Sequence, residues 1–160
     1  MATIIRSAET RDLPALGRMG AALMRTHYAF DEARFISPDG GAEDGYAGFL
    51  GSQLRASDAV VMVAETDGVV VGYVYAGIEP LSWKELRDEA GFVHDLLVSP
   101  DARNSGAGRQ LLDAAIAWLR ERGMPRVVLW TAARNAGAQR LFERRGFRST
   151  MVEMTLELDP

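Results

Sequence analysis

The chain has 160 residues, a formal net charge of −4 at pH 7 and no cysteine. This length suits one domain with a substantial buried core. The missing cysteine excludes disulfides, thiolate nucleophiles and cysteine-ligated zinc. The acidic balance argues against nucleic acid as the main partner and mildly favours a cationic acceptor. With only His27 and His94 available, a metal site would need mostly carboxylate ligands, and we expect none.

The start of the chain does not resemble an export signal. Arg6 and Glu9 come too early for the apolar core of a signal peptide, and no apolar run approaches the roughly 18 residues of a membrane span. We therefore expect a cytoplasmic protein without membrane contact, whose residues 1–160 form a single domain.

The first third of the chain predicts one strand and two helices. Residues 3–8 have strand character, and the Thr-Arg-Asp-Leu-Pro sequence at 10–14 is typical of a capped helix start. An apolar stripe continues that helix to Met24. The acidic, glycine-rich segment 30–45 predicts a long loop, which in other proteins is usually functional or disordered. Apolar residues in 46–54 predict a second, short helix.

The middle of the chain predicts a β-hairpin. Two β-rich runs, 59–65 and 69–78, flank Thr66-Asp67-Gly68, and an Asp-Gly pair between such runs is a specific hairpin signal. Both alternating sets of side chains in the second run are apolar or aromatic, so we expect both faces of that strand to be covered. The charged segment 81–90 predicts a short surface helix.

A buried strand then passes directly into a glycine loop and an amphipathic helix. The run from Phe92 to Val98 is apolar and β-branched. Residues 103–108 cannot extend it, and apolar residues then return at helical spacing until Gly123. A loop at a helix N-terminus presents unpaired backbone N–H groups and the positive end of the helix dipole, so it binds an anion, most often a phosphate.

The last part of the chain predicts two strands and a helix. A buried strand is expected over 127–131, and Asn135 caps a helix that runs to Arg145 and ends at Gly146. Alternating apolar and polar residues in 151–158 predict a half-exposed closing strand. Together these elements predict a three-layer α/β domain with a mixed sheet that divides near the strand of residues 92–98.

The end of the sheet also suggests an assembly. The apolar alternation of the last strand, together with Trp130 and Met154, leaves an edge that a partner chain could cover. We therefore predict a homodimer.

The glycine loop has several interpretations. An ordinary strand-to-helix turn with a solvated Arg103 would show the same glycines. A nucleotide P-loop needs Gly-Lys-Ser/Thr, and no lysine is near. A dinucleotide fingerprint needs a third glycine where Leu111 stands.

The pattern Arg103-x-x-Gly106-x-Gly108, after a Val-Ser-Pro strand end, resembles the pyrophosphate-binding loop of the GCN5-related N-acetyltransferase (GNAT) family. A second signature of that family, Asn-x-x-Ala-x-x-Leu-Tyr-x-x-x-Gly-Phe, is matched in the right order and spacing by Asn135, Ala138, Leu141, Phe142, Gly146 and Phe147. Phe142 is the one departure.

The resemblance implies a fold and an activity. The fold is a GNAT-like α/β/α domain whose mostly antiparallel sheet splays at an acyl-CoA cleft. The activity is transfer of acetyl from acetyl-CoA to a primary amine, on a small molecule, a peptide or a protein N-terminus, by direct attack in a ternary complex. The residues implied for acetyl-CoA are Leu96, Leu97, Val98, Arg103, Asn104, Ser105, Gly106, Ala107, Gly108, Arg109, Asn135 and Phe142.

Direct attack requires a base and an oxyanion donor. A backbone N–H at Leu97 or Val98 is the expected donor. His94 occupies the strand position where some polyamine-acetylating members carry a glutamate, and an imidazole suits proton removal at neutral pH. A sheet histidine satisfied by a neighbour is the alternative. Strand alternation points Asp95 to the opposite face, so only one of the pair is expected to face the acceptor; Asp95 is the candidate if His94 faces the core.

Phe142 stands where the family usually has a tyrosine that can protonate the departing thiolate. A phenyl ring cannot donate a proton, so we expect slower turnover or rescue by another hydroxyl, such as that of Tyr73 or Tyr75. Two further functions fit the sequence. One is a non-catalytic acyl-CoA sensor, and the other is a phosphate-binding domain unrelated to coenzyme A.

Overall fold

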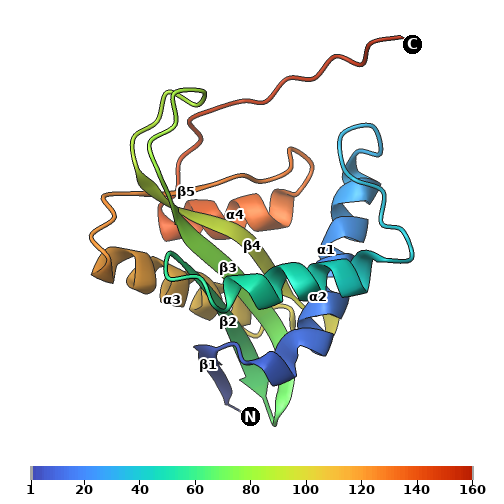
Figure 1. Ribbon diagram of the computed structural model, residues 1–160, viewed down its shortest axis with the longest axis vertical. Coiled ribbons are helices and arrows are strands. Elements are labelled where there is room, and N and C mark those ends of the chain that lie inside the picture. Colours follow the sequence, from blue (N-terminus) through green and yellow to red (C-terminus); the bar gives the residue numbers. More distant parts are fainter. Residues whose placement is uncertain (1, 160) are drawn as a thin grey trace.

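A computed structural model describes residues 2–159 and shows a five-stranded sheet with helices on both faces (Figure 1). The elements in chain order are β1 (Thr3–Ser7), the single turn η1 (Thr10–Asp12), α1 (Leu13–Phe30), α2 (Ala42–Gln53), β2 (Ala59–Thr66), β3 (Val69–Glu79), β4 (Ala90–Val98), the single turn η2 (Pro100–Ala102), α3 (Ala107–Glu121), β5 (Val127–Leu129) and α4 (Ala136–Arg145).

The strands lie in the order β1-β2-β3-β4-β5. The first four are antiparallel neighbours, and β5 runs parallel to β4. Between β2 and β3, Asp67 and Gly68 have φ angles of 51° and 78°. A two-residue type I′ turn requires positive φ at both positions, so the Asp-Gly hairpin is confirmed.

Two clusters of side chains hold the layers together. On one face, Leu16 of α1 and Leu50 of α2 pack with Val63 and Tyr73 of the sheet. On the other face, apolar residues of α3 and Phe142 of α4 pack with a second set of strand residues. Each fully buried leucine stabilises the fold by about 2 kcal/mol. The three-layer prediction is confirmed, as is the cover on both faces of β3.

The sheet divides between β4 and β5. These strands pair only where Gly91–Val93 lies beside Val127–Leu129. From His94 to Val98, β4 has β3 on one side and no strand of the described residues on the other. The predicted splay is therefore confirmed.

Residues 81–90 are not a helix. Ser82 and Arg87 exchange two backbone hydrogen bonds of 2.8 and 3.1 Å, which close a tight hairpin loop. Because β3 and β4 are adjacent antiparallel strands, this short connection must reverse the chain. Its charge pattern reflects exposure rather than helical periodicity.

The predicted closing strand at 151–158 is also wrong. Residues 147–159 have no strand assignment, and Figure 1 shows them leaving the body after α4 and running outward. Their large apolar side chains are 82–89% exposed: Met151, Val152, Met154, Leu156 and Leu158. Alternating apolar and polar residues are compatible with a strand, but they do not show with which edge of the sheet the segment pairs. The homodimer stays a prediction.

Within residues 2–159, no helix combines the length and the apolar character that crossing a membrane requires.

Candidate active site

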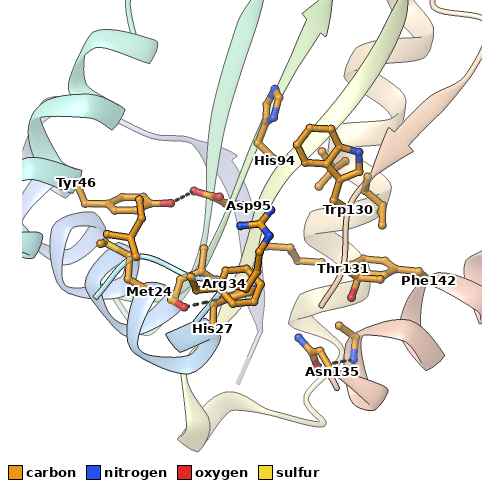
Figure 2. A pocket seen from close by; sticks show the side chains of 17 residues that line it. Met24, His27, Arg34, Tyr46, His94, Asp95, Trp130, Thr131, Asn135 and Phe142 are labelled. Atoms are coloured by element: carbon orange, nitrogen blue, oxygen red, sulfur yellow. Dashed lines mark hydrogen bonds between the residues drawn. The ribbon is translucent and has the colours of Figure 1, made fainter. Parts of the chain in front are cut away.

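A cleft of about 300 Å³ opens where β4 and β5 separate (Figure 2). This volume suits a small organic ligand. Its walls come from α1, the loop after it, α2, β4, β5 and α4. The lining residues are Leu23, Met24, His27, Arg34, Phe35, Ile36, Tyr46, Val93, His94, Asp95, Leu96, Leu129, Trp130, Thr131, Asn135, Ala138 and Phe142.

The loop at the N-terminus of α3 is shaped to receive an anion. Asn104 and Gly106 have φ angles of 63° and 89°, which turn the chain sharply into the helix. The Ser105 hydroxyl accepts the Ala107 N–H at 3.3 Å. The backbone N–H groups of Gly108 and Arg109 have no hydrogen-bond partner among the described residues. Free first-turn amides and the helix dipole together favour a phosphate there.

The strand residues expected to meet the cofactor lie along the open edge of β4. Leu96 lines the cleft. Leu96 and Val98 pack with the α3 layer, whereas Leu97 packs with the α1 and α2 layer. The backbone of these three residues has β3 on one side only, so its other side is available to an extended ligand.

Asn135 and Phe142 form the end of the cleft on α4. The Asn135 side chain caps α4, because its Oδ1 accepts the Ala138 N–H at 3.2 Å. Phe142 is buried and packs edge-on against Phe147. Both residues line the cleft, but the Asn135 oxygen is already engaged within the protein.

Asp95 carries a carboxylate into this cleft. Its Oδ2 accepts hydrogen bonds from the hydroxyls of Tyr46, at 2.6 Å, and Tyr73, at 3.0 Å; Figure 2 shows the Tyr46 contact. Its Oδ1 has no hydrogen-bond partner among the described residues. Every fully buried side-chain oxygen of these residues does have a partner, so Oδ1 is not fully buried. Oδ1 is therefore accessible to a ligand.

Burial raises the pKa of Asp95 above its usual range, because desolvation penalises the carboxylate more than the two hydroxyl donors stabilise it. Burial and the nearby charge of Asp95 also raise the pKa values of Tyr46 and Tyr73. Both tyrosines therefore remain neutral donors.

His94 is held by its neighbours. Its Nε2 lies 2.9 Å from Oε1 of Glu79, and its side chain is 28% exposed. The ring stacks on Tyr75 at 4.8 Å and on Phe92 at 5.6 Å. Figure 2 shows the imidazole directed away from the Asp95 carboxylate.

The expectation that only one of His94 and Asp95 faces the cleft is wrong. Tyr75 pairs with Asp95 and Ala76 pairs with Val93, so His94 is the extra residue of a β-bulge. A bulge interrupts the alternation of side chains. As a result, two consecutive residues line the same cleft.

Neither hydroxyl named as a substitute for the missing tyrosine is free. The Tyr73 side chain is fully buried and donates to Asp95. The Tyr75 hydroxyl donates to Oε1 of Gln53 at 3.2 Å. The structure therefore places Tyr73 beside the carboxylate rather than beside Phe142.

Sequence reasoning missed Tyr46 and Arg34 as residues of the cleft. Tyr46 belongs to the apolar pattern of α2, and Arg34 lies in an irregular loop. Only the tertiary arrangement of α2 and of this loop brings both residues to the cleft that Asp95 also lines. A polar tip on an otherwise apolar helix face was the one signal available for Tyr46.

Comparison with known proteins agrees with this geometry. The family model described as the acetyltransferase (GNAT) family matches residues 23–147. The uncharacterized N-acetyltransferase YhfO of Bacillus subtilis is 28% identical over 145 residues, which cover 89% of this chain and 88% of that protein. A mycothiol acetyltransferase of Cellulomonas flavigena is 37% identical over 98 residues, which cover 58% of this chain and only 28% of that protein.

A solved structure shares the fold. The aminoglycoside N-acetyltransferase AAC(6')-Iy in complex with CoA superposes with a TM-score of 0.76 at 19% identity, covering 98% of this chain and 95% of that one. The chain therefore belongs to the acetyltransferase (GNAT) family.

Proposed function

We propose that this enzyme acetylates a primary amine by direct attack of the amine on the thioester, with Asp95 as the general base. The observation that carries the proposal is the Asp95 carboxylate in the cleft, held through Oδ2 by two tyrosines and accessible at Oδ1. A small molecule is the favoured acceptor over a protein N-terminus, since mycothiol and aminoglycoside acetyltransferases are among the similar proteins.

The loop and the open strand edge fit acetyl-CoA, which supplies the activated acetyl group. The free amides of Gly108 and Arg109 would hold the pyrophosphate, with charge from Arg103. The β4 backbone at Leu96, Leu97 and Val98 would hold the extended arm, and a backbone N–H at Leu97 or Val98 would stabilise the oxyanion. The loop residues Asn104, Ser105, Gly106 and Ala107, together with Asn135 and Phe142, complete the proposed cofactor site.

Asp95 contributes to the acceptor side in two ways. Its negative charge attracts an ammonium group, and its Oδ1 then takes a proton from that group. An ordinary carboxylate is a weak base for an ammonium ion whose pKa is about 10, so a raised pKa at Asp95 narrows the gap. The neutral amine forms the new C–N bond as the C–S bond breaks, and the acylated nitrogen then releases its second proton to solvent. The departing thiolate takes its proton from solvent, because Phe142 has none to give.

His94 is the alternative base. Its pairing with Glu79 and its stacking between two rings favour a structural role. The two candidates are separated by measuring thiol release from acetyl-CoA over a panel of amines, with wild-type protein, Asp95→Asn and His94→Gln. We expect Asp95→Asn to lose about 100-fold or more in turnover and His94→Gln to lose less than tenfold. The reverse order would assign the base to His94.

The same assay tests the sensor function, which the phenylalanine at position 142 favours. Binding of acetyl-CoA without thiol release for any amine in the panel would identify a non-catalytic module. Thiol release that depends on an amine supports the enzyme.

We also propose a homodimer, in which the segment 148–159 of one copy pairs with the open edge of β5 in the other. This segment makes no backbone hydrogen bond to the sheet, and β5 has a strand on one side only. Trp83 and Leu86, at the tip of the β3–β4 hairpin, are also largely exposed. If the segment paired with β5 of its own chain, the tip of the β3–β4 hairpin would stay exposed. A second copy can cover both the β5 edge and this tip.

Introduced cysteines test this pairing cleanly because the chain has none of its own. Val128→Cys is combined in turn with Val152→Cys, Met154→Cys or Leu156→Cys. We expect disulfide-linked dimers on non-reducing gels and dimers in sedimentation at micromolar concentrations. Disulfides within one chain, or a monomer without any link, would contradict the proposal.

A further inference from the structure

Arg34 is a cleft residue whose guanidinium holds a carboxylate. Its Nε and Nη2 donate to the two carboxylate oxygens of Glu153, with Nη2 at 2.9 Å from Oε2. This two-point contact is the geometry that arginine uses to bind carboxylate ligands. Figure 2 shows the Arg34 side chain reaching toward the middle of the cleft.

The backbone that carries Arg34 is a built part of the cleft wall. The N–H groups of Arg34 and Phe35 both donate to the Asp31 carbonyl, at 3.2 and 3.1 Å. The Phe35 ring packs edge-on against His27 of α1, with ring centroids 5.1 Å apart. The guanidinium lies over the same Phe35 ring. Arg34 is therefore positioned by the loop and by α1, independently of Glu153.

The carboxylate that Arg34 holds is, by contrast, weakly anchored. Glu153 lies in the segment 148–159, which has no backbone hydrogen bond to the rest of the described chain. The Glu153 and Arg34 side chains are 60% and 41% exposed, and an exposed ion pair of this kind stabilises little. A ligand carboxylate in the cleft could therefore displace that of Glu153.

We propose that Arg34 is the carboxylate subsite for the acceptor and that the acceptor is a free amino acid with an apolar side chain. Its ammonium group would lie at Oδ1 of Asp95 and its carboxylate at Arg34, with an apolar side chain against Met24, Phe35 and Ile36. This inference rests on the proposed function, because it names the acceptor class for the same cleft. In the single chain of the structure, Glu153 occupies this subsite.

Matched acceptors test the subsite because they differ only in the carboxylate. L-phenylalanine is compared with phenethylamine, and L-leucine with 3-methylbutylamine. We expect wild-type kcat/KM to be about 10- to 100-fold higher for each amino acid, which is the range expected for a hydrogen-bonded charge. Glycine, β-alanine and 4-aminobutyrate then report the separation between the two subsites.

Three variants decide whether the preference comes from Arg34. Arg34→Gln should raise KM for the amino acids by about 10- to 100-fold, with a much smaller change in KM for the plain amines. Arg34→Lys should restore part of the preference. Glu153→Gln, the matched control, should lower KM for amino acids a few-fold because it removes the competing carboxylate. Equal losses on both members of a pair would overturn the inference.

Binding separates failure of this inference from failure of the proposed function. Calorimetry of L-phenylalanine added to the CoA-saturated protein needs no turnover. Binding that Arg34→Gln abolishes supports the subsite even if no amine is acetylated. Acetylation of plain amines without any preference for amino acids would overturn the subsite and leave the acetyltransferase function intact.

Discussion

The Tyr46 hydroxyl on α2 donates a 2.6 Å hydrogen bond to the Asp95 carboxylate on β4, although the two residues are 49 positions apart. With Tyr73 donating to the same oxygen, this contact fixes one oxygen of the proposed base and leaves the other accessible. The position of α2 against the sheet therefore controls the orientation of the carboxylate.

Tyr46→Phe tests this relationship. The hydroxyl lowers the pKa of Asp95, so its loss should raise that pKa further. Since the base acts only when deprotonated, the acidic limb of the pH–rate profile should move to higher pH, and kcat at pH 7 should fall about tenfold. Tyr75→Phe is the control, because its hydroxyl contacts Gln53 rather than Asp95. A profile that is unchanged in Tyr46→Phe would remove Tyr46 from the site.

Asp95→Asn should make the protein more stable while it lowers turnover by about 100-fold or more. The raised pKa of Asp95 means that the folded protein holds this proton more tightly than the unfolded chain does. The neutral carboxyl thus contributes to the free energy of unfolding in full below the unfolded pKa of about 3.9, and this contribution is lost as the pH rises through the folded pKa.

The neutral amide avoids this loss, so we expect the Tm of Asp95→Asn to exceed that of wild type by a few degrees at pH 8. The difference should shrink toward pH 4. Differential scanning calorimetry across this range measures it. A difference that is independent of pH would show that the substitution acts through packing instead.

Local signals explain which parts of the fold were predictable from sequence. The Asp67-Gly68 turn and the Asn135 cap each depend on residues adjacent in the chain, and both were predicted correctly. The Tyr46–Asp95 contact depends on how a helix lies across a sheet, for which the sequence contains no local pattern. The hairpin loop at 81–90 is charged because it is exposed, and exposed helices share that composition.

The residue at position 94 shows how one irregularity changes a site. Alternation along β4 predicts opposite faces for His94 and Asp95, but the bulge adds one residue to the strand and so both residues line the same cleft. Nothing in the surrounding apolar run marks the bulge. The strand prediction for residues 151–158 is wrong for a related reason. The segment has the alternating pattern of a strand, but strand pairing also requires a sheet edge, and the segment does not reach one.

Gly106→Ala should weaken acetyl-CoA binding more than Gly108→Ala. Gly106 has a φ of 89°, a conformation that L side chains rarely adopt, so alanine there strains the loop by about 1–2 kcal/mol. At Gly108 an added Cβ would lie 3.5 Å from Val98 and 3.6 Å from Leu141, which are ordinary contacts. The two glycines of the loop are therefore expected to differ in their sensitivity to substitution.

Calorimetric titration with acetyl-CoA should give a Kd that rises about tenfold for Gly106→Ala and less than threefold for Gly108→Ala. Arg103→Ala should raise the Kd by a factor between these two, because salt screens an exposed charge. Unchanged affinity in a folded Gly106→Val protein would contradict the assignment of this loop to the pyrophosphate.

Phe142→Tyr should raise turnover. Phe142 is buried, lines the cleft and packs edge-on against Phe147, so one added hydroxyl preserves the ring contacts and places a proton donor at the position where the second signature has a tyrosine. Neither Tyr73 nor Tyr75 substitutes for it, because their hydroxyls are engaged with Asp95 and Gln53. General acid catalysis contributes about 100-fold or more when proton transfer limits the rate.

A coenzyme A thiolate leaves readily, since a thiol of this kind has a pKa of about 8.5, so we expect a smaller gain of about three- to tenfold in kcat. Thiol release with a saturating acceptor from pH 6 to 9 measures the effect. The gain should decrease as the pH approaches 9, because above the thiol pKa of about 8.5 the thiolate no longer needs a proton. Phe142→Leu, which removes the ring and adds no donor, is the control for packing. A turnover that is equal in wild type and Phe142→Tyr at every pH would show that amine attack or product release limits the rate, and that the departure from the signature has no catalytic consequence.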